Sequence, residues 1–377
     1  MRLLLACVMV AGTAREGGGS LKKLDHLQSL RFVAASMVVV DHAIETMVRR
    51  GALDTGFLQS AWFCGWAGVT SFFMISGLIM IRTSWTSFAV AGASATFAVR
   101  RIIRVVPLYW LATALFALVA ASKGQFFTLE QVLKSLLFIP YALPGSVLIR
   151  PIAGQGWTLD YEMAFYALFV LCLLLHRRAG VAMLLAVPLL FVVIGTLARP
   201  MFPYRDAATP LQFWTDPIML AFSIGVAIGI FEIRMPTWHR FRHSVAGSLA
   251  IYALIYWLCT LIDPGYRLPV YGVGCAVAVL LCTSADTGGN GPLGRLFVRC
   301  GDASYSTYLF HPFAIMALSV LWGHSPAALQ SPILFIVVGV VAANALGILS
   351  YRLLERPIEH RLRVLVESRF SRMPVVR

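Results

Sequence analysis

Charged residues are scarce in this chain, and their scarcity argues against a soluble protein. Only 13% of its 377 residues are charged and 59% are hydrophobic, whereas soluble domains have about 25% charged and about 45–50% apolar residues. The mean hydropathy of +0.79 agrees with surroundings that are mostly lipid. The apolar segments are longer and more uniform than the short alternating segments of a membrane β-barrel. Because backbone groups in lipid must be satisfied internally, we expect an all-α polytopic membrane protein.

Acidic residues are also few, and the cysteines lack any regular spacing. The chain has 17 acidic against 31 basic residues and a net charge of +14, yet no basic, aromatic-interleaved soluble module that would bind nucleic acid. The excess of positive charge is instead typical of the cytoplasmic loops of membrane proteins. The 7 cysteines are scattered without metal-ligand or disulfide spacing. We interpret them as small apolar fillers and expect no metal site and no permanently bound cofactor.

Ten apolar segments approach the length of a membrane-spanning helix. They fall at about 27–48, 62–82, 105–122, 158–176, 180–198, 216–233, 244–262, 268–284, 304–322 and 332–354. With the N-terminus inside, 22 of the 31 basic residues lie on the cytoplasmic side and 8 opposite, while Arg31 lies within a span. This asymmetry predicts about ten transmembrane helices with both termini cytoplasmic. We expect residues 83–104 to form a cytoplasmic connection.

The boundaries of the membrane domain follow from composition. Residues 1–20 contain a short apolar run before a glycine-rich stretch. We interpret them as a dispensable N-terminal extension, with a signal peptide as the alternative. Residues 21–360 are expected to form one membrane domain, followed by a basic cytoplasmic tail at 361–377. Residues 130–144 indicate an interfacial helix or loop.

Arg31 and His42 are the most informative residues, because charged and titratable groups are expensive in a bilayer and are functional candidates by default. Eleven helical steps of about 100° bring both side chains to one helix face, about 16 Å apart along the axis. That geometry suits a long ligand with its anionic end at Arg31 and its reactive end at His42. A neutral imidazole is a natural general base. A structural histidine is the alternative.

A second basic group, Arg100, Arg101 and Arg104, covers one side of a helix. Arginine binds phosphates through several planar donors. The functional interpretation is a cytoplasmic site for the phosphates of a nucleotide-like ligand. The alternative is a membrane anchor that contacts anionic lipid.

Other polar residues lie near the ends of the predicted spans. Glu162 begins the fourth span and is predicted to orient His42 or raise its basicity, while Asp160 fits a carboxylate that the helix dipole stabilises. Asp41 is a poor partner for His42, since adjacent helical residues do not face each other. His311 lies before a proline that frees backbone carbonyls, which favours a structural hydrogen bond.

Together, several strings resemble the acyltransferase-3 family of integral membrane O-acyltransferases, and most closely its exopolysaccharide-modifying branch. The resemblance runs from about Leu24 to Glu359. It rests on Arg31 with His42, Gly68–Gly77, Arg100–Trp110, Gly156–Tyr166, Gly301–Pro312 and Glu355–Pro357. Five or six such strings in the right order make chance resemblance improbable.

The resemblance implies a bacterial inner-membrane enzyme that moves an acyl group, most commonly acetyl, from cytoplasmic acyl-CoA. The acceptor would be a hydroxyl of a polysaccharide or of its lipid-linked repeat unit. Arg100, Arg101 and Arg104 would hold the CoA phosphates, and Arg31 would guide the donor. His42, assisted by Glu162, would be catalytic. Four further residues would support the structure or shape the substrate site: His311, Ser76, Trp157 and Tyr166.

Two functions of another class stay open. A secondary transporter fits ten spans with buried charges, although such proteins often contain internal repeats and we find none here. A carrier that moves acyl groups across the membrane without its own chemistry is closer to the proposed role. Product formation that depends on a thioester would separate an enzyme from either alternative.

Overall fold

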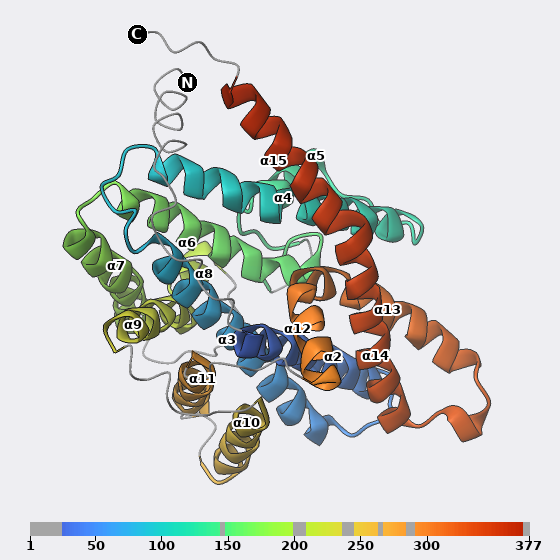
Figure 1. The fold of residues 1–377 in the computed structure, drawn as a ribbon. Coiled ribbons are helices and arrows are strands. Elements are labelled where there is room, and N and C mark those ends of the chain that lie inside the picture. The colour runs from blue at the N-terminus through green and yellow to red at the C-terminus, as the bar shows by residue number, and fades with distance from the viewer. Residues whose placement is uncertain are drawn as a thin grey trace. The chain divides into compact units, whose positions relative to one another are not determined.

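The computed structural model describes residues 25–143, 148–198, 209–235, 245–262, 267–283 and 291–371. These residues are almost entirely helical, and the β-type pairing among them is one isolated antiparallel bridge between Ala142 and Ile149. The all-α fold predicted from composition is therefore confirmed for this part of the chain (Figure 1). The predicted extension at 1–20 lies outside the described residues, as does 372–377 of the predicted tail.

Each of the ten apolar segments coincides with a helix. In the described part of the chain, six stretches are long and apolar enough to cross a membrane: Asp25–Arg49, Thr55–Ser84, Ala93–Ala121, Arg177–Ala198, Pro210–Arg234 and Pro332–Val366. Two shorter apolar helices are Gly247–Thr260 and Val270–Thr283. The structure thus supports a chain with several apolar spans, while the count of ten and the sides of the termini stay predictions.

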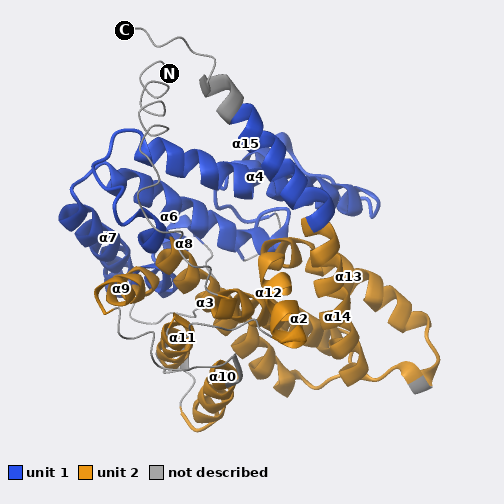
Figure 2. Ribbon diagram, viewed as in Figure 1, with its two compact units in different colours: residues 1–21, 80–223, 352–377 blue, residues 22–79, 224–351 orange. Residues whose placement is uncertain are grey.

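The described residues form two compact units, coloured separately in Figure 2. Unit 1 lies within residues 80–223 and 352–371, and unit 2 within residues 25–79 and 224–351. Among the described residues, two α-helices cross the boundary between them, α3 (Leu58–Ser84) and α9 (Leu220–Arg234), and so does the π-helical turn Tyr351–Glu355. Each unit is therefore described by itself.

Unit 2 is organised around α2 (Asp25–Arg49), most of which is buried. The helices that pack against α2 are α10 (Val245–Thr260), α11 (Arg267–Thr283), α12 (Pro292–Asp302), α13 (Ser304–His324) and α14 (Pro332–Ser350). Val39, Ala43 and Met47 of α2 form a core with Ile315 of α13 and Phe335 of α14. This core fixes the face of α2 that carries the candidate site.

Small residues bring other backbones close to α2. A Cβ added at Gly68 of α3 would lie 2.6 Å from the carbonyl oxygen of Ala34. A Cβ added at Gly301 of α12 would lie 1.9 Å from the carbonyl oxygen of Gln28. Both approaches need glycine, because any side chain would displace a main-chain carbonyl.

Unit 1 contains α4 (Ala93–Ala121), α5 (Leu129–Leu136), α6 (Trp157–Leu173), α7 (Arg177–Ala198), α8 (Pro210–Trp214) and α15 (Arg356–Ser371). A π-helical turn, Tyr351–Glu355, leads into α15. Helix α6 packs against α4 and α7, and α15 packs against α4. Phe97 of α4 stacks on Phe169 of α6 with ring centroids 4.8 Å apart.

The predicted connection at 83–104 is much shorter than expected. Helix α4 begins at Ala93, directly after Gly92 in the left-handed conformation with φ of 78°. Residues 93–104 contain neither proline nor a further glycine, so the helix of the apolar segment extends back through the arginines. Only a short turn separates α3 from α4. Similarly, α15 continues through most of the predicted tail.

Candidate active site

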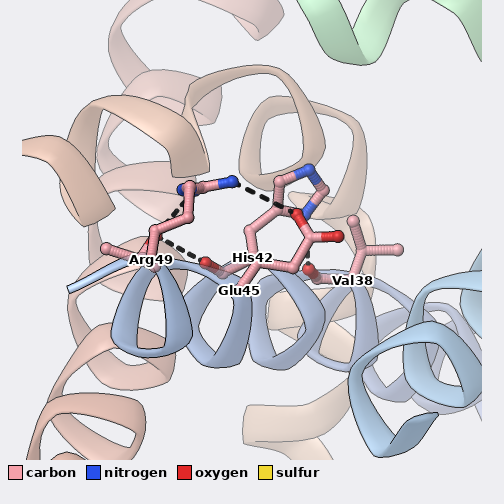
Figure 3. A network of polar contacts seen from close by, with 5 residues as sticks. Val38, His42, Glu45 and Arg49 are labelled. Carbon is pink, nitrogen blue, oxygen red and sulfur yellow. Dashed lines mark hydrogen bonds and ion pairs between the residues drawn. The ribbon is translucent and has the colours of Figure 1, made fainter. Parts of the chain in front are cut away.

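His42 lies in the C-terminal half of α2 and is partly buried. Its Nδ1 is 2.9 Å from the carbonyl oxygen of Val38, one turn earlier (Figure 3). Because a carbonyl oxygen can only accept, Nδ1 must carry the hydrogen and donate it. The other ring nitrogen, Nε2, then has the basic lone pair of the neutral imidazole. The backbone of α2 therefore holds His42 in the tautomer that a general base requires.

A second histidine stands beside the first. The His311 ring of α13 and the His42 ring lie 5.0 Å apart between centroids, in an edge-to-face arrangement at 70°. His311 is fully buried, with 0% of its surface exposed. Its Nδ1 donates to the carbonyl oxygen of Tyr308 at 2.8 Å. The structural hydrogen bond predicted for His311 is present, but the contact with His42 was not predicted.

Arg31 lies on the same uninterrupted helix as His42, so the shared face inferred from their spacing needs no correction for a kink. Its side chain is 9% exposed and donates to the Gln28 side chain at 3.4 Å. The rise of an α-helix puts about 16 Å between the two positions. A cation and a base are thus spaced along one helix, as a long anionic substrate would require.

Asp41 points toward α3 and is only 4% exposed. A Cβ added at Gly65 of α3 would lie 2.1 Å from the Asp41 Oδ2 atom. The absence of a side chain at Gly65 therefore makes room for this carboxylate. The expectation that Asp41 does not serve His42 agrees with this placement.

The C-terminal turns of α2 carry a polar network beyond His42 (Figure 3). The Thr46 hydroxyl donates to the His42 carbonyl oxygen at 2.7 Å. Arg49 donates to the Thr46 hydroxyl at 3.2 Å and lies 3.7 Å from the Glu45 carboxylate. This network stabilises the last turn of α2. It was not predicted from the sequence.

The three arginines of α4 have different surroundings in unit 1. Arg100 is exposed. The Arg101 guanidinium lies over two aromatic rings, 5.3 Å from the centroid of Phe97 and 5.3 Å from that of Tyr166. Arg104 is within electrostatic reach of several carboxylates of its own unit: Glu355, Glu162 and Glu359. Arg100 is consequently the arginine of the three that is most open to an external phosphate.

Glu162 lies in the second turn of α6, in this same group. The Tyr166 hydroxyl, four residues later on α6, donates a hydrogen bond to the Glu162 carboxylate. Glu162 also faces the positive charge of Arg104. The structure therefore brings together four predicted residues, Glu162, Tyr166, Arg101 and Arg104. Because His42 belongs to unit 2, the predicted assistance of His42 by Glu162 stays a prediction.

The remaining residues singled out from the sequence are Trp157, Ser76 and Asp160. Trp157 opens α6 and packs edge-on against Tyr161, with centroids 5.9 Å apart. Ser76 is partly buried in α3. Asp160 is in the first turn of α6, as its interpretation as a helix-start carboxylate requires, and is 2% exposed. Neither of its oxygens has a hydrogen-bond partner among the described residues.

Comparison with known proteins assigns this arrangement to a family. The acyltransferase domain family matches residues 24–352. The chain belongs to this acyltransferase family. It is 34% identical over 309 residues to the exopolysaccharide production protein ExoZ of Rhizobium meliloti (strain 1021), which covers 79% of this chain and 90% of that protein. It is 26% identical over 371 residues to nodulation protein 10 of Rhizobium leguminosarum bv. viciae, which covers 91% and 95% respectively. No solved structure shows a significant match.

For an acyltransferase, unit 2 holds the two groups whose chemistry is easiest to assign. His42 and Arg31 share one helix, and their spacing could be predicted from periodicity. The missed neighbour, His311, has one signal in the sequence, which is its position in an apolar segment next to Pro312. That signal marks His311 as unusual but does not place it beside His42.

Proposed function

We propose that this acyltransferase moves an acyl group from a cytoplasmic acyl-CoA to a hydroxyl of an exopolysaccharide, or of its lipid-linked repeat unit. The relationship to a protein named for exopolysaccharide production supports this acceptor class. Acetyl is the acyl group we propose. We further propose ten spans in a bacterial inner membrane with both termini cytoplasmic, so that the donor arrives from the side of the basic loops.

The observation that carries the proposal is the tautomer of His42. Its Nδ1 is occupied by the Val38 carbonyl, so Nε2 can take the proton of an acceptor hydroxyl. The oxygen then attacks the thioester carbonyl carbon, the carbon–sulfur bond breaks, and the proton held by His42 passes to the departing sulfur. Each proton is accounted for without a permanent cofactor. A transient acyl-histidine is the alternative route.

Donor binding is assigned to the arginines. Arg100, which is exposed, would contact the CoA phosphates directly. Arg101 and Arg104 already have aromatic and acidic neighbours, so they would add positive potential and keep α4 in place. Arg31 would attract the donor along α2 toward His42. Glu162 would assist His42, and Trp157 and Ser76 would shape the substrate site.

Label transfer from the donor tests this function. Inside-out membrane vesicles from a producing strain that lacks the chromosomal gene would carry the plasmid-borne native chain and receive acetyl-CoA labelled in its acetyl group. We expect label in alkali-labile ester linkage on precipitable polysaccharide and an equal amount of free CoA. A secondary transporter or a carrier without transfer chemistry would give neither product. Vesicles without the chain are the control.

A further inference from the structure

His311 is placed against His42, yet the transfer chemistry described above does not use it. The two rings come from different helices, α13 and α2, which pack together within unit 2. Their edge-to-face contact, with centroids 5.0 Å apart, allows ring atoms to touch. A second titratable side chain next to His42, the proposed general base, therefore requires a physical explanation.

The hydrogen bonds of the two rings define which nitrogens are available. Each ring uses Nδ1 to donate to a main-chain carbonyl, His42 to Val38 and His311 to Tyr308. In neutral imidazoles this leaves Nε2 as an acceptor on both rings. The His311 Nε2 atom is buried and has no hydrogen-bond partner among the described residues. A buried acceptor without a donor carries its full desolvation cost.

Protonation of His42 would supply the missing donor. Once His42 has taken a proton on Nε2, it becomes a cation with a new N–H group in a poorly hydrated site. A neighbouring neutral imidazole is a good acceptor for that group, and a charge-assisted hydrogen bond is stronger than a neutral one. Since two adjacent cationic imidazoles repel each other, only one of the pair would be charged at a time.

We propose that His311 is a positioning residue that accepts a hydrogen bond from protonated His42 through its Nε2 atom. This inference rests on the proposed acyl transfer. The acceptor hydroxyl loses its proton to Nε2 of His42, and the new N–H group is shared, as a three-centre hydrogen bond, between the reacting oxygen and the Nε2 lone pair of His311. The thioester carbonyl carbon then gains the new oxygen bond and loses its bond to sulfur. The proton leaves His42 for the sulfur, and both imidazoles return to the neutral state.

The competing interpretation is that His311 only supports α13 through the Nδ1 bond to Tyr308. Two substitutions separate the roles of the two nitrogens. In His311→Asn the amide can still donate near the former Nδ1 position, but no atom replaces Nε2. In His311→Gln the longer side chain brings an amide oxygen near the former Nε2 position and can accept. A structural role predicts that Asn is the better replacement, whereas our proposal predicts Gln.

The experiment compares native, His311→Asn, His311→Gln, His42→Ala and His42→Ala/His311→Asn chains in the labelled acetyl-CoA vesicle assay. Initial rates are divided by the amount of folded chain in each vesicle preparation. We expect His311→Asn to lower the maximal rate about 10- to 100-fold, which is the loss expected for one hydrogen bond to a charged group. The KM for acetyl-CoA should stay within about twofold of the native value. We expect His311→Gln to recover part of the lost rate.

The double variant provides a second readout. If His311 acts through His42, the double variant should be no slower than His42→Ala alone, because residues that act as a unit are not additive. A multiplied loss, a fully active His311→Asn chain, or equal losses in Asn and Gln would each overturn the proposal. Native vesicles that transfer no label would overturn the proposed function itself, whatever the His311 variants do.

Discussion

The Tyr166 hydroxyl donates a hydrogen bond to the Glu162 carboxylate one helical turn earlier on α6. The same tyrosine ring lies under the Arg101 guanidinium. Glu162 is thus held by a neighbour on its own helix and faces the positive charge of Arg104 on α4. These contacts fix the direction in which the Glu162 carboxylate points, as its proposed role in orienting a histidine base also requires.

The first prediction concerns this hydrogen bond. Tyr166→Phe keeps the ring against Arg101 but removes the donor to Glu162, so the carboxylate loses its fixed orientation. We expect a maximal transfer rate about tenfold lower, equivalent to about 1.4 kcal/mol, with a normal amount of folded chain. The labelled acetyl-CoA assay measures it. Tyr256→Phe, which removes a comparable hydroxyl contact with Ser60, is the matched control, and equal activity of the two variants would contradict the role of Glu162.

A second prediction separates two arginines one turn apart on α4. Arg100→Gln should raise the KM for acetyl-CoA about 10- to 100-fold, because it removes an exposed cation from the proposed phosphate site and a hydrogen bond to a charged group contributes about 1.5–3 kcal/mol. Its effect on stability should be small. Arg104→Gln should instead lower the amount of folded chain, since it removes the positive charge that faces the buried Glu355 carboxylate.

Substrate titrations and thermal unfolding of the purified chain measure the two effects. Arg100→Lys, which keeps the positive charge, is the control for the first variant. An unchanged KM in Arg100→Gln would remove this residue from the donor site. An Arg104→Gln chain that folds normally and binds donor poorly would assign Arg104 to the phosphates instead.

A third prediction tests the packing of α12 on α2. Gly301→Ala puts a Cβ where the Gln28 carbonyl oxygen now lies, at 1.9 Å, so one backbone must move. Overpacking of this kind costs about 1–3 kcal/mol or more, and we expect a lower unfolding temperature. Gly272→Ala in α11 is the control, because its added Cβ meets nothing within 4 Å. Equal unfolding temperatures for the two variants would refute the close approach.

The sequence predicted those parts of the site that depend on one helix. Arg31 and His42 share a face because helix periodicity alone determines their relative direction. The close approach at Gly68 was likewise visible as a small residue in an apolar segment. Glu162 and Tyr166 are also one turn apart, so the spacing of i and i+4 residues accounts for their contact.

Contacts between helices could not be predicted in the same way. His42 and His311 meet because α13 packs on α2 through the core around Ile315 and Ala43, and no local pattern encodes that pairing. The surroundings of Arg101 also depend on how α4 packs against α6. Finally, α4 begins at Ala93 and not after the arginines, because alanine and arginine are good helix formers.

The measurement that tests the central claim most directly is proton NMR of the polysaccharide secreted by a deletion strain complemented with native, His42→Ala or His324→Ala chains at matched membrane abundance. His324 is an exposed histidine whose Nδ1 makes the same kind of bond to a carbonyl one turn earlier, at 2.8 Å. We predict that the native and His324→Ala chains restore O-acyl signals and that His42→Ala does not. Restoration of the esters by His42→Ala would contradict a catalytic role for His42.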